Sequence, residues 1–586
     1  MNEYDFEKID ELKIKYICFD YFDTIVHRNI SDEDVKRLWA KELSYRLLQQ
    51  NVDILPNVLY EIRKKAERTV GNFYKFSNEP RYEWIINVMF SFFANDIEVT
   101  NAEFYSLAIE SEVKVELDCQ VLDLKTVEMI RTVKEKGYTV LLLTDFYLPQ
   151  EEFERFLNKH DLSHLFDYIY VSSEYDVRKS NGSMYKLVKE QLFAQDSAIM
   201  IGDNENSDVV QAERNGLYSI HKLYQKVCEQ NDYITIESKL KRIAKEKKEV
   251  YSNYAFVTYL FIEKLYRELH YRKIRKAYFL SREGDYLKYL FELYQKLNMK
   301  QNQTEIETRY LYVSRVALRD ALKNGKENLQ KYFESEGINC KEDEICIVDV
   351  GWKGSMQDII RCLFPNVKIK GFYLGLTTKA LCNDENQKYG MVFTPYPNKT
   401  IGYHTFLYDS FMQERLLCAN HGSVMFYDEA GVPVLDEQSN AEKLSECIKE
   451  IRNDMNDTFL AIFKVLEKSC YSMSNFEYLC ARLYLQEMLS VGKKHKMLRC
   501  KLEKNDTEVV ISDNDTNQHS ISKLKKIKKQ IKEIIEDEGQ PISYLQFILM
   551  YTKKIKLGWC EGFMKPVILG FQKVKLRKEY NKRGRL

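Results

Sequence analysis

Short apolar runs that alternate with helical patterns constrain this chain more than any other feature of its sequence. Residues 14–24 read as an apolar strand that runs directly into acidic residues. Further strands are predicted at Thr139–Leu143, Tyr168–Val171, Ala198–Ile201 and Leu217–Ile220, with helices between them at 126–136, 149–158, 183–193 and 207–214. This alternation predicts a parallel, doubly wound sheet, in which ligands bind at the carboxyl ends of the strands.

Four of these strands are followed by residues with the chemistry of phosphoryl transfer. Asp20 ends the first strand, where a carboxylate nucleophile can project into a cleft. Thr144 ends the second, where its hydroxyl can hold a phosphoryl oxygen. Lys179 follows the third, where a fixed ammonium can neutralise the charge of the nucleophile and of the substrate.

The fourth strand leads into Gly202-Asp203-Asn204-Glu205-Asn206-Ser207-Asp208. Asp203 and Asp208 lie five residues apart on a turn that enters a helix. Carboxylate oxygens suit Mg²⁺, which keeps water and substrate oxygens as its other ligands. We therefore predict a Mg²⁺ site that includes these two residues and Asp20.

The order Asp20…Thr24, Thr144, Lys179, Asp203…Asp208 resembles the four motifs of the haloacid dehalogenase (HAD) superfamily. The resemblance covers about the first 225 residues. It implies that Asp20 attacks phosphorus, that Thr144 and Lys179 hold the transferring group, and that the substrate contacts Thr24, Asp145 and Asn204. The helical insert between the first two motifs, about residues 31–116, resembles a mobile cap that closes over the site, excludes water and selects the substrate.

One position departs from this pattern. HAD phosphatases carry a general acid two residues after the nucleophile, but Phe22 stands there, and Asp23 comes one place later. Three alternatives stay open: Asp23 or a cap residue supplies the acid, a phosphoaspartate lasts long enough for phosphotransfer, or the domain mainly binds. Dehalogenases also lack this acid, but they need no metal. The complete Asp203/Asp208 pair therefore favours phosphate chemistry.

A chain of 586 residues is too long for one hydrophobic core. We predict a HAD-like domain over 1–225 (core 1–30 and 117–225, with the cap between them) and a charged helical connector over 226–250. A second α/β domain should follow over 251–435, with strands at Lys276–Leu280, Ile345–Val350 and Lys370–Leu376. Residues 436–586 should be mainly helical, interrupted by a polar loop or short hairpin at Glu503–Ser520.

The second α/β domain contains a glycine-rich turn, Gly351–Ser355, between a strand and a helix. Its glycines, Lys353 and Ser355 have the ingredients of an anion cradle, although their spacing matches no standard nucleotide-binding pattern. Arg282 and Arg315 each follow a serine and could face the same cleft, where together they would suit a diphosphate or a sugar phosphate. The alternative to a binding site is an ordinary strand–helix turn in which Trp352 packs in the core and Arg315 forms a surface salt bridge.

The segments around Arg282, Arg315 and Gly351–Ser355 also resemble the long bacterial HAD proteins found among surface-polysaccharide genes. This resemblance implies a role in polysaccharide metabolism. The sequence thus favours a Mg²⁺-dependent phosphohydrolase acting on a phosphorylated sugar or nucleotide-sugar-like metabolite. The rival hypothesis is a non-hydrolytic binding or scaffold module that works with polysaccharide-assembly enzymes. Phe22 is its main support.

The charge of the chain is balanced, with 88 Lys and Arg against 88 Asp and Glu, so no nucleic-acid partner is expected. Residues 551–586 are an exception, with 11 Lys and Arg against two Glu, interleaved with Trp559, Phe563 and Phe571. Such a tail could lie on an anionic membrane surface or be a solvated helix. No signal peptide or membrane span is evident, so we expect a cytoplasmic protein, with the tail as its one peripheral membrane contact.

Overall fold

The computed structural model describes residues 12–73, 80–193, 196–223, 233–298, 305–341, 344–383, 386–395, 400, 402–407, 409–437, 440–490 and 492–505, and, near the end of the chain, 574, 576–578, 580 and 581. The chain forms two compact units. The first is Met1–Ile236 with Lys468–Tyr471, and the second is Glu237–Glu467 with Ser472–Leu586. Each unit contains a five-stranded sheet of its own.

The first sheet has the strand order β5-β4-β1-β6-β7, and every neighbouring pair is parallel. Its strands are β1 (Ile14–Phe19), β4 (Thr139–Thr144), β5 (Tyr168–Val171), β6 (Ser197–Gly202) and β7 (Tyr218–His221). Because side chains alternate along a strand, Ile17 and Phe19 enter the core on one face, and Cys18 enters the core on the other. The predicted doubly wound sheet is confirmed.

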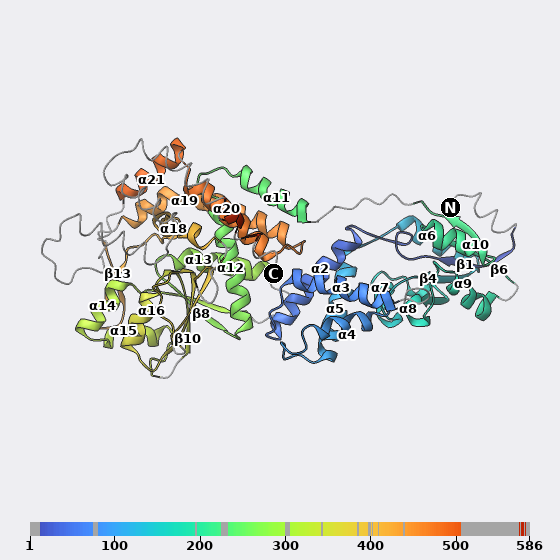
Figure 1. The fold of residues 1–586 in the computed structure, drawn as a ribbon, viewed down its shortest axis with the longest axis horizontal. Coiled ribbons are helices and arrows are strands. Elements are labelled where there is room, and N and C mark those ends of the chain that lie inside the picture. The colour runs from blue at the N-terminus through green and yellow to red at the C-terminus, as the bar shows by residue number, and fades with distance from the viewer. Residues whose placement is uncertain are drawn as a thin grey trace. The chain divides into compact units, whose positions relative to one another are not determined.

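The helices of this unit lie close to their predicted positions (Figure 1). They are α6 (Leu124–Glu135), α7 (Gln150–Lys159), α8 (Ser172–Tyr175), α9 (Ser183–Val188) and α10 (Gln211–Arg214), with a 3₁₀ turn η1 (Ser163–Leu165) and two π-helical segments, η2 (Lys189–Phe193) and η3 (Glu205–Val210). Two predicted helices, 183–193 and 207–214, are therefore each divided between an α-helical and a π-helical part.

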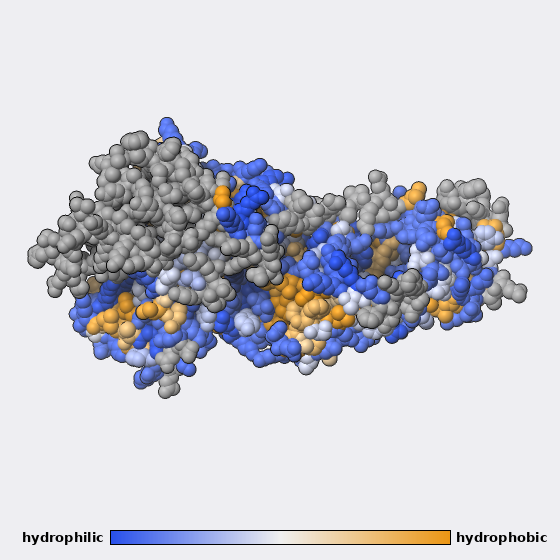
Figure 2. All heavy atoms as spheres, viewed as in Figure 1, coloured by the Kyte–Doolittle hydropathy of each residue, from blue (hydrophilic) through white to orange (hydrophobic). Residues whose placement is uncertain are grey.

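Four helices form the insert: α2 (Asp32–Gln49), α3 (Pro56–Phe73), α4 (Tyr82–Ser91) and α5 (Asn101–Cys119). A short antiparallel pair, β2 (Val26–Arg28) with β3 (Gln120–Leu122), joins them to the sheet. Thr100 and Glu103 form a reciprocal capping box at the start of α5. Hydrophobic residues gather on the visible face around α4 and α5 (Figure 2), and Phe92, just after α4, is 52% exposed.

A buried ion pair between two helices of the insert is joined to the sheet domain through Tyr147. The Arg63 guanidinium of α3 is fully buried and donates to both Glu112 carboxylate oxygens, at 2.6 and 3.1 Å. The Tyr147 hydroxyl, from the loop after β4, donates to Glu112 Oε1 at 2.5 Å. The hydrophobic core on this face of the sheet continues into the insert. The insert is therefore anchored by polar as well as apolar contacts.

The second sheet has the order β12-β11-β10-β8-β9 and is also entirely parallel. Its strands are β8 (Lys276–Leu280), β9 (Glu307–Leu311), β10 (Glu344–Trp352), β11 (Lys368–Leu376) and β12 (Asn386–Phe393). The three predicted strands are confirmed as β8, β10 and β11. The two that the sequence did not reveal, β9 and β12, are the edge strands, where polar residues replace a continuous apolar run.

The remaining elements of the second unit are a hairpin, β13 (Val424–Tyr427) with β14 (Pro433–Leu435), and ten helices among the described residues: α12 (Tyr254–Tyr271), α13 (Gly284–Asn298), α14 (Arg315–Asn324), α15 (Glu327–Ser335), α16 (Ser355–Leu363), α17 (Tyr403–Phe406), α18 (Ser410–Leu417), α19 (Ala441–Leu466), α20 (Met473–Met488) and α21 (Lys493–Asn505). The mainly helical region after residue 436 is thus confirmed as far as residue 505.

Two expected boundaries differ from the structure. The connector helix, predicted to include 238–250, is α11 (Tyr233–Glu246), and the division between the two units falls inside it. The predicted loop Glu503–Ser520 begins in helix, because α21 continues to Asn505, and the rest of that stretch lies outside the described residues.

The described part of the chain contains no helix that is both long enough and apolar enough to cross a bilayer. The basic tail at 551–586 lies outside the described residues except for 574, 576–578, 580 and 581. The expected contact between this tail and a membrane therefore stays a prediction.

Candidate active site

The predicted catalytic residues meet at the carboxyl edge of the first sheet. Asp20 directly follows β1, and its N–H donates to the Ile201 carbonyl at 2.9 Å, which fixes its position beside the end of β6. Thr144 is the last residue of the neighbouring strand β4. The Lys179 side chain and Asp208 complete a buried cluster with Asp20.

Lys179 joins two carboxylates of this cluster. Its ammonium lies 2.5 Å from Asp20 Oδ1 and 2.7 Å from Asp208 Oδ1. Burial opposes the charged form of Lys179. The attraction of the two carboxylates outweighs burial and raises the pKa of Lys179 well above its ordinary value. Lys179 is therefore a fixed positive charge beside Asp20, an arrangement that suits phosphoryl transfer.

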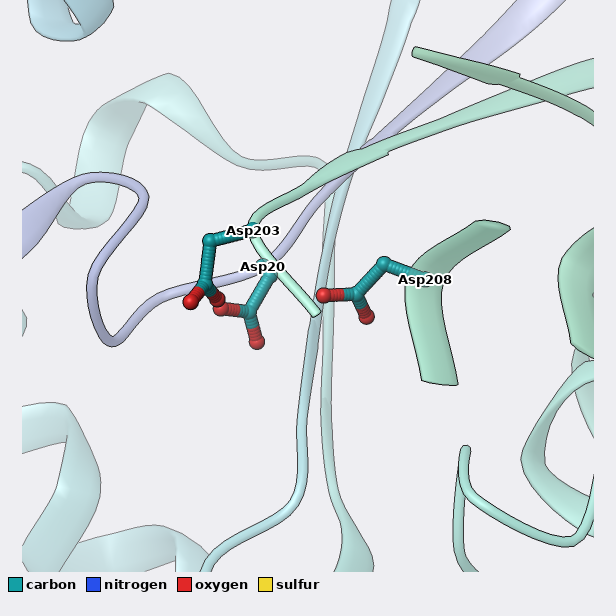
Figure 3. A group of neighbouring side chains, drawn as sticks. All are labelled: Asp20, Asp203 and Asp208. Atoms are coloured by element: carbon teal, nitrogen blue, oxygen red, sulfur yellow. The ribbon is translucent and has the colours of Figure 1, made fainter. Parts of the chain in front are cut away.

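Asp20, Asp203 and Asp208 form an acidic triad in which one oxygen from each lies within 4.8 Å of the others. Figure 3 shows the three carboxylates gathered together. Burial raises the pKa of Asp20 to about 7; Lys179 opposes this rise, and the charge of Asp208 adds to it. Burial and Asp208 also raise the pKa of Asp203. The three residues offer only oxygen ligands, and a divalent cation would relieve their repulsion, so the set fits Mg²⁺.

Gly202 allows this triad to form. A Cβ at position 202 would lie 2.3 Å from Oδ2 of Asp208 and 2.4 Å from its Cγ. Asp208 Oδ2 also accepts a hydrogen bond from the Asn204 N–H at 3.0 Å. The absence of a side chain at Gly202 therefore leaves the space in which the Asp208 carboxylate lies.

Two threonines contribute hydroxyls at this edge. The Thr24 hydroxyl donates a hydrogen bond to Asp20 Oδ2 at 3.2 Å. Thr144 is 1% exposed, and its hydroxyl has no hydrogen-bond partner among the described residues. A buried hydroxyl without a partner is costly and calls for an explanation. A phosphoryl oxygen bound at the strand end would supply the missing partner.

Two residues expected to contact the substrate accept hydrogen bonds from the backbone of the loops of the site. Both Asp145 oxygens accept the Lys179 backbone N–H, at 2.9 and 3.2 Å. The Asn204 side chain caps the following helical segment by accepting the Ser207 N–H at 2.9 Å. In this structure Asp145 and Asn204 therefore position the lysine and the turn from Asp203 to Asp208.

The structure places Asp23 close to the cluster, whereas Phe22 faces aromatic groups. The Phe22 ring lies 4.9 Å from the Phe146 ring, and the Arg28 guanidinium covers it at 4.0 Å. Asp23 has a φ of +54°, a conformation uncommon for a residue with a side chain. The negative charge of Asp23 contributes to the raised pKa of Asp203. Asp23 is thus the nearby carboxylate that the sequence suggested.

Sequence reasoning missed three residues near this edge. His27 Nδ1 lies 3.7 Å from Asp23 Oδ1, and His27 Nε2 lies 3.2 Å from Asp123 Oδ2. The Lys222 ammonium contacts the same Asp123 oxygen at 2.7 Å. Hydrogen bonds from Lys222 and the Thr126 N–H outweigh burial and hold the pKa of Asp123 well below its usual range. The helical insert separates His27 from Asp123 in sequence, so no local pattern could join them.

The four residues predicted in the second unit differ in their surroundings. Arg282 is buried, whereas Arg315 is exposed at the first turn of α14. The Lys353 side chain is exposed, and its carbonyl accepts a hydrogen bond from the Lys388 ammonium at 3.1 Å. Ser355 is the first residue of α16. Trp352 is partly exposed and stacks on Phe393.

An open parallel sheet with a buried carboxylate, a lysine and an acidic triad at its carboxyl edge defines a class of α/β hydrolase domain with an aspartate nucleophile. Residues 14–216 match the family model described as haloacid dehalogenase-like hydrolase, so this part of the chain is similar to that family. No curated protein matches the sequence.

Solved structures with similarity to this chain include a dehalogenase, a HAD-hydrolase and a predicted phosphatase. One is a 2-haloacid dehalogenase from Pseudomonas syringae pv. Tomato DC3000, 16% identical, with 37% of this chain and 92% of that chain covered and a TM-score of 0.28. Another is the HAD-hydrolase YfnB from Bacillus subtilis bound to magnesium, 18% identical, with 36% and 96% covered and a TM-score of 0.26. A third, described as a predicted phosphoglycolate phosphatase from Haemophilus somnus 129PT, is 18% identical, with 36% and 85% covered and a TM-score of 0.23. The family assignment depends on the family model.

Proposed function

We propose that the HAD-like domain is a Mg²⁺-dependent phosphohydrolase that acts on a small phosphorylated metabolite through Asp20. The observation that carries this proposal is the buried cluster in which Lys179 joins Asp20 to Asp208, with Asp203 within metal-binding distance. The partnerless Thr144 hydroxyl on the adjacent strand supports it.

In the proposed reaction, a carboxylate oxygen of Asp20 attacks phosphorus, and the bond from phosphorus to the leaving oxygen breaks. Lys179 stabilises the charge of the nucleophile and of the transferring group, and the Thr144 hydroxyl donates to a phosphoryl oxygen. Mg²⁺, when held by Asp20, Asp203 and Asp208, would neutralise negative charge on the phosphoryl group. Water then attacks the phosphoaspartate, releases phosphate and regenerates the Asp20 carboxylate.

The leaving oxygen needs a proton, and Asp23 is our proposed donor. Asp23 is partly exposed and lies beside His27, and its charge raises the pKa of Asp203. Phe22, in contrast, carries no acidic group. An Asp23→Asn variant should therefore slow release from substrates with poor leaving groups more than release from an aryl phosphate, whose leaving group needs no acid.

The main test is phosphate release from a panel of sugar phosphates and an aryl phosphate, with Mg²⁺ or EDTA. We expect metal-dependent release that disappears in Asp20→Asn. Asp196→Asn is the matched control, because Asp196 is an exposed carboxylate just before β6 that pairs only with the exposed Lys15 among the described residues. Equal release by wild type and Asp20→Asn would contradict the proposal, as would release that EDTA leaves unchanged.

A second candidate function is phosphotransfer or binding without efficient hydrolysis. The packing of Phe22 against Phe146 under Arg28 favours it, because this position then offers no group to activate the attacking water. This candidate predicts that the aryl phosphate leaves an acid-stable, hydroxylamine-sensitive phosphoryl group on Asp20, detectable by intact-protein mass spectrometry, with little free phosphate.

The substrate class, location and partners are further parts of this proposal. Resemblance to proteins of surface-polysaccharide gene clusters supports a phosphorylated sugar or nucleotide-sugar-like substrate and an association with polysaccharide-assembly enzymes. We place the enzyme in the cytoplasm, with the basic tail 551–586 in peripheral contact with an anionic membrane. Salt-sensitive sedimentation with anionic liposomes, lost when residues 551–586 are deleted, would support that contact, and no sedimentation would contradict it.

A further inference from the structure

The strand order of the second sheet contains a topological switch point between β8 and β10. The chain goes from β8 outward to the edge strand β9 and then returns to β10 on the other side of β8. The connections after β8 and β10 therefore leave the sheet in opposite directions. In open α/β sheets, ligands bind outside the carboxyl ends of the strands at such a switch point.

Three carboxylates from three different elements gather at this point. Asp349 lies near the end of β10, Glu283 follows β8, and Glu414 belongs to α18. Burial raises the pKa of Asp349 to about 7, and the charges of Glu283 and Glu414 contribute to the rise. Burial, followed by Glu283, also raises the pKa of Glu414. The three groups are thus near enough to repel one another.

Asp349 is a buried carboxylate without a side-chain hydrogen-bond donor among the described residues. It is 7% exposed. Its carboxylate accepts the N–H of the next residue, Val350, and among the described residues no side chain donates a hydrogen bond to it. A carboxylate that is nine-tenths buried beside two others destabilises the fold, and such groups are concentrated at functional sites.

Two arginines carry positive charge near this edge. The positive charge of Arg315 lowers the pKa of both Asp349 and Glu414, although Arg315 makes no ion pair with any described residue. Arg282, which follows β8, is buried, and its positive charge lowers the pKa of Tyr310 and of Cys418. The edge therefore presents acceptors and charged donors together.

This combination argues against a bare ion as the ligand. Among the described residues, no metal-sized group of carboxylates includes Asp349, Glu283 or Glu414, so a cation clamp is not formed. The three carboxylates lie beside the positive charges of Arg315 and Arg282, so the charge of this edge favours neither a free anion nor a free cation. A sugar hydroxyl can donate to a carboxylate and accept from a guanidinium, and so it satisfies both kinds of group.

An aromatic wall completes the arrangement. The Trp352 indole N–H donates to Glu414 Oε1 at 2.6 Å, and its ring stacks on Phe393 with centroids 5.6 Å apart. These contacts fix a large, partly exposed aromatic side chain at the end of β10. A rigid aromatic side chain beside directional polar groups is a common composition of small-molecule sites.

We propose that the carboxyl edge between β8 and β10 is a binding site for a neutral, hydroxyl-rich ligand such as one unit of a carbohydrate. Asp349, Glu283 and Glu414 accept hydrogen bonds from its hydroxyls, and Arg315 donates to them. Trp352 packs against its carbon skeleton. The site belongs to the second sheet and does not depend on phosphate chemistry at Asp20.

The test is hydrogen–deuterium exchange of the full chain with a panel of neutral mono- and disaccharides, and separately with inorganic phosphate and with MgCl₂. We expect at least one saccharide to protect the peptides that contain 281–286 and 347–355. Asp349→Asn and Glu414→Gln should each weaken the apparent affinity at least tenfold. Glu344→Gln is the matched control, because Glu344 is an exposed carboxylate at the opposite end of β10.

Protection by no saccharide in wild type would overturn the proposal, whatever the behaviour of the variants. Protection of these peptides by phosphate or MgCl₂ alone would overturn it in favour of an ion site. Saccharide protection that survives both Asp349→Asn and Glu414→Gln would show that the ligand binds elsewhere.

Discussion

Replacing Asp349 by Asn should stabilise the second unit, and the gain should depend on pH. Asn has nearly the shape of the protonated Asp side chain and can still accept the Val350 N–H, but it carries no charge. The folded state holds the pKa of Asp349 at about 7, against 3.8 for a free carboxyl. Stability from this residue is therefore complete below pH 3.8 and is lost as the pH rises through about 7.

The size of the effect follows from that difference. About 3 pKa units at 1.36 kcal/mol each give a gain of about 4 kcal/mol for Asp349→Asn at pH 8. At pH 5 the difference counts for only about one pKa unit, so the gain should fall to about 1 kcal/mol. The change between the two pH values, about 3 kcal/mol, is more diagnostic than either value alone.

Hydrogen exchange of β10 amides at pH 5 and pH 8, corrected for intrinsic rates, measures this local stability. Glu344→Gln, on the same strand but half exposed, should shift it by less than about 1 kcal/mol at either pH. A loss of stability in Asp349→Asn at pH 8 would refute the reasoning, because it would mean that the ionised carboxylate supports the fold. An equal effect at both pH values would do the same.

Three further changes concern the first unit. Gly202→Ala should reduce Mg²⁺ affinity by about 10–100-fold, since its Cβ would displace Asp208; calorimetric titration with Mg²⁺ measures this. Lys179→Met should destabilise the metal-free protein by about 3–5 kcal/mol, because it leaves buried carboxylates uncompensated. Urea unfolding in EDTA should show the loss, and added Mg²⁺ should recover part of it. Arg63→Met should likewise cost about 3–5 kcal/mol, because Glu112 then lies buried without its partner.

The lysine and arginine changes each have a surface control. Lys15→Met and Arg131→Met remove exposed cations from surface ion pairs and should change stability by less than about 1 kcal/mol. Unaltered Mg²⁺ binding in Gly202→Ala would mean that Asp208 is not a ligand. Lys179→Met or Arg63→Met variants as stable as their surface controls would show that these buried cations do not compensate the carboxylates beside them.

Much of the first site could be predicted because each of its signals is local. An apolar run that ends in Asp20, Thr144 or Asp203 identifies a strand end, and parallel strands bring their carboxyl ends to one edge. The same reasoning located β8, β10 and β11 in the second sheet. It failed for the edge strands β9 and β12, whose partly polar sequences lack the pattern of a buried strand.

Roles that depend on a partner far away in sequence could not be predicted. Asp145 and Asn204 accept backbone N–H groups of the loops that carry Lys179 and Ser207, and the sequence did not indicate these contacts. A carboxylate or amide has the same appearance in a sequence whether its donor is a ligand or the backbone. The contact of His27 with Asp123 likewise requires the pairing of β2 with β3 across the whole insert.

By itself the sequence determined the two α/β regions and, in the first, the strand-end positions of Asp20, Lys179 and the acidic pair, because strand ends and the residues that follow them are adjacent in the chain. Only the tertiary structure decided that Asp349, Glu283 and Glu414 lie at one edge of the second sheet. Their meeting depends on β8 and β10 becoming neighbours while β9 goes to the outside. That order is fixed by long-range packing of the whole unit, and no short stretch of sequence carries it.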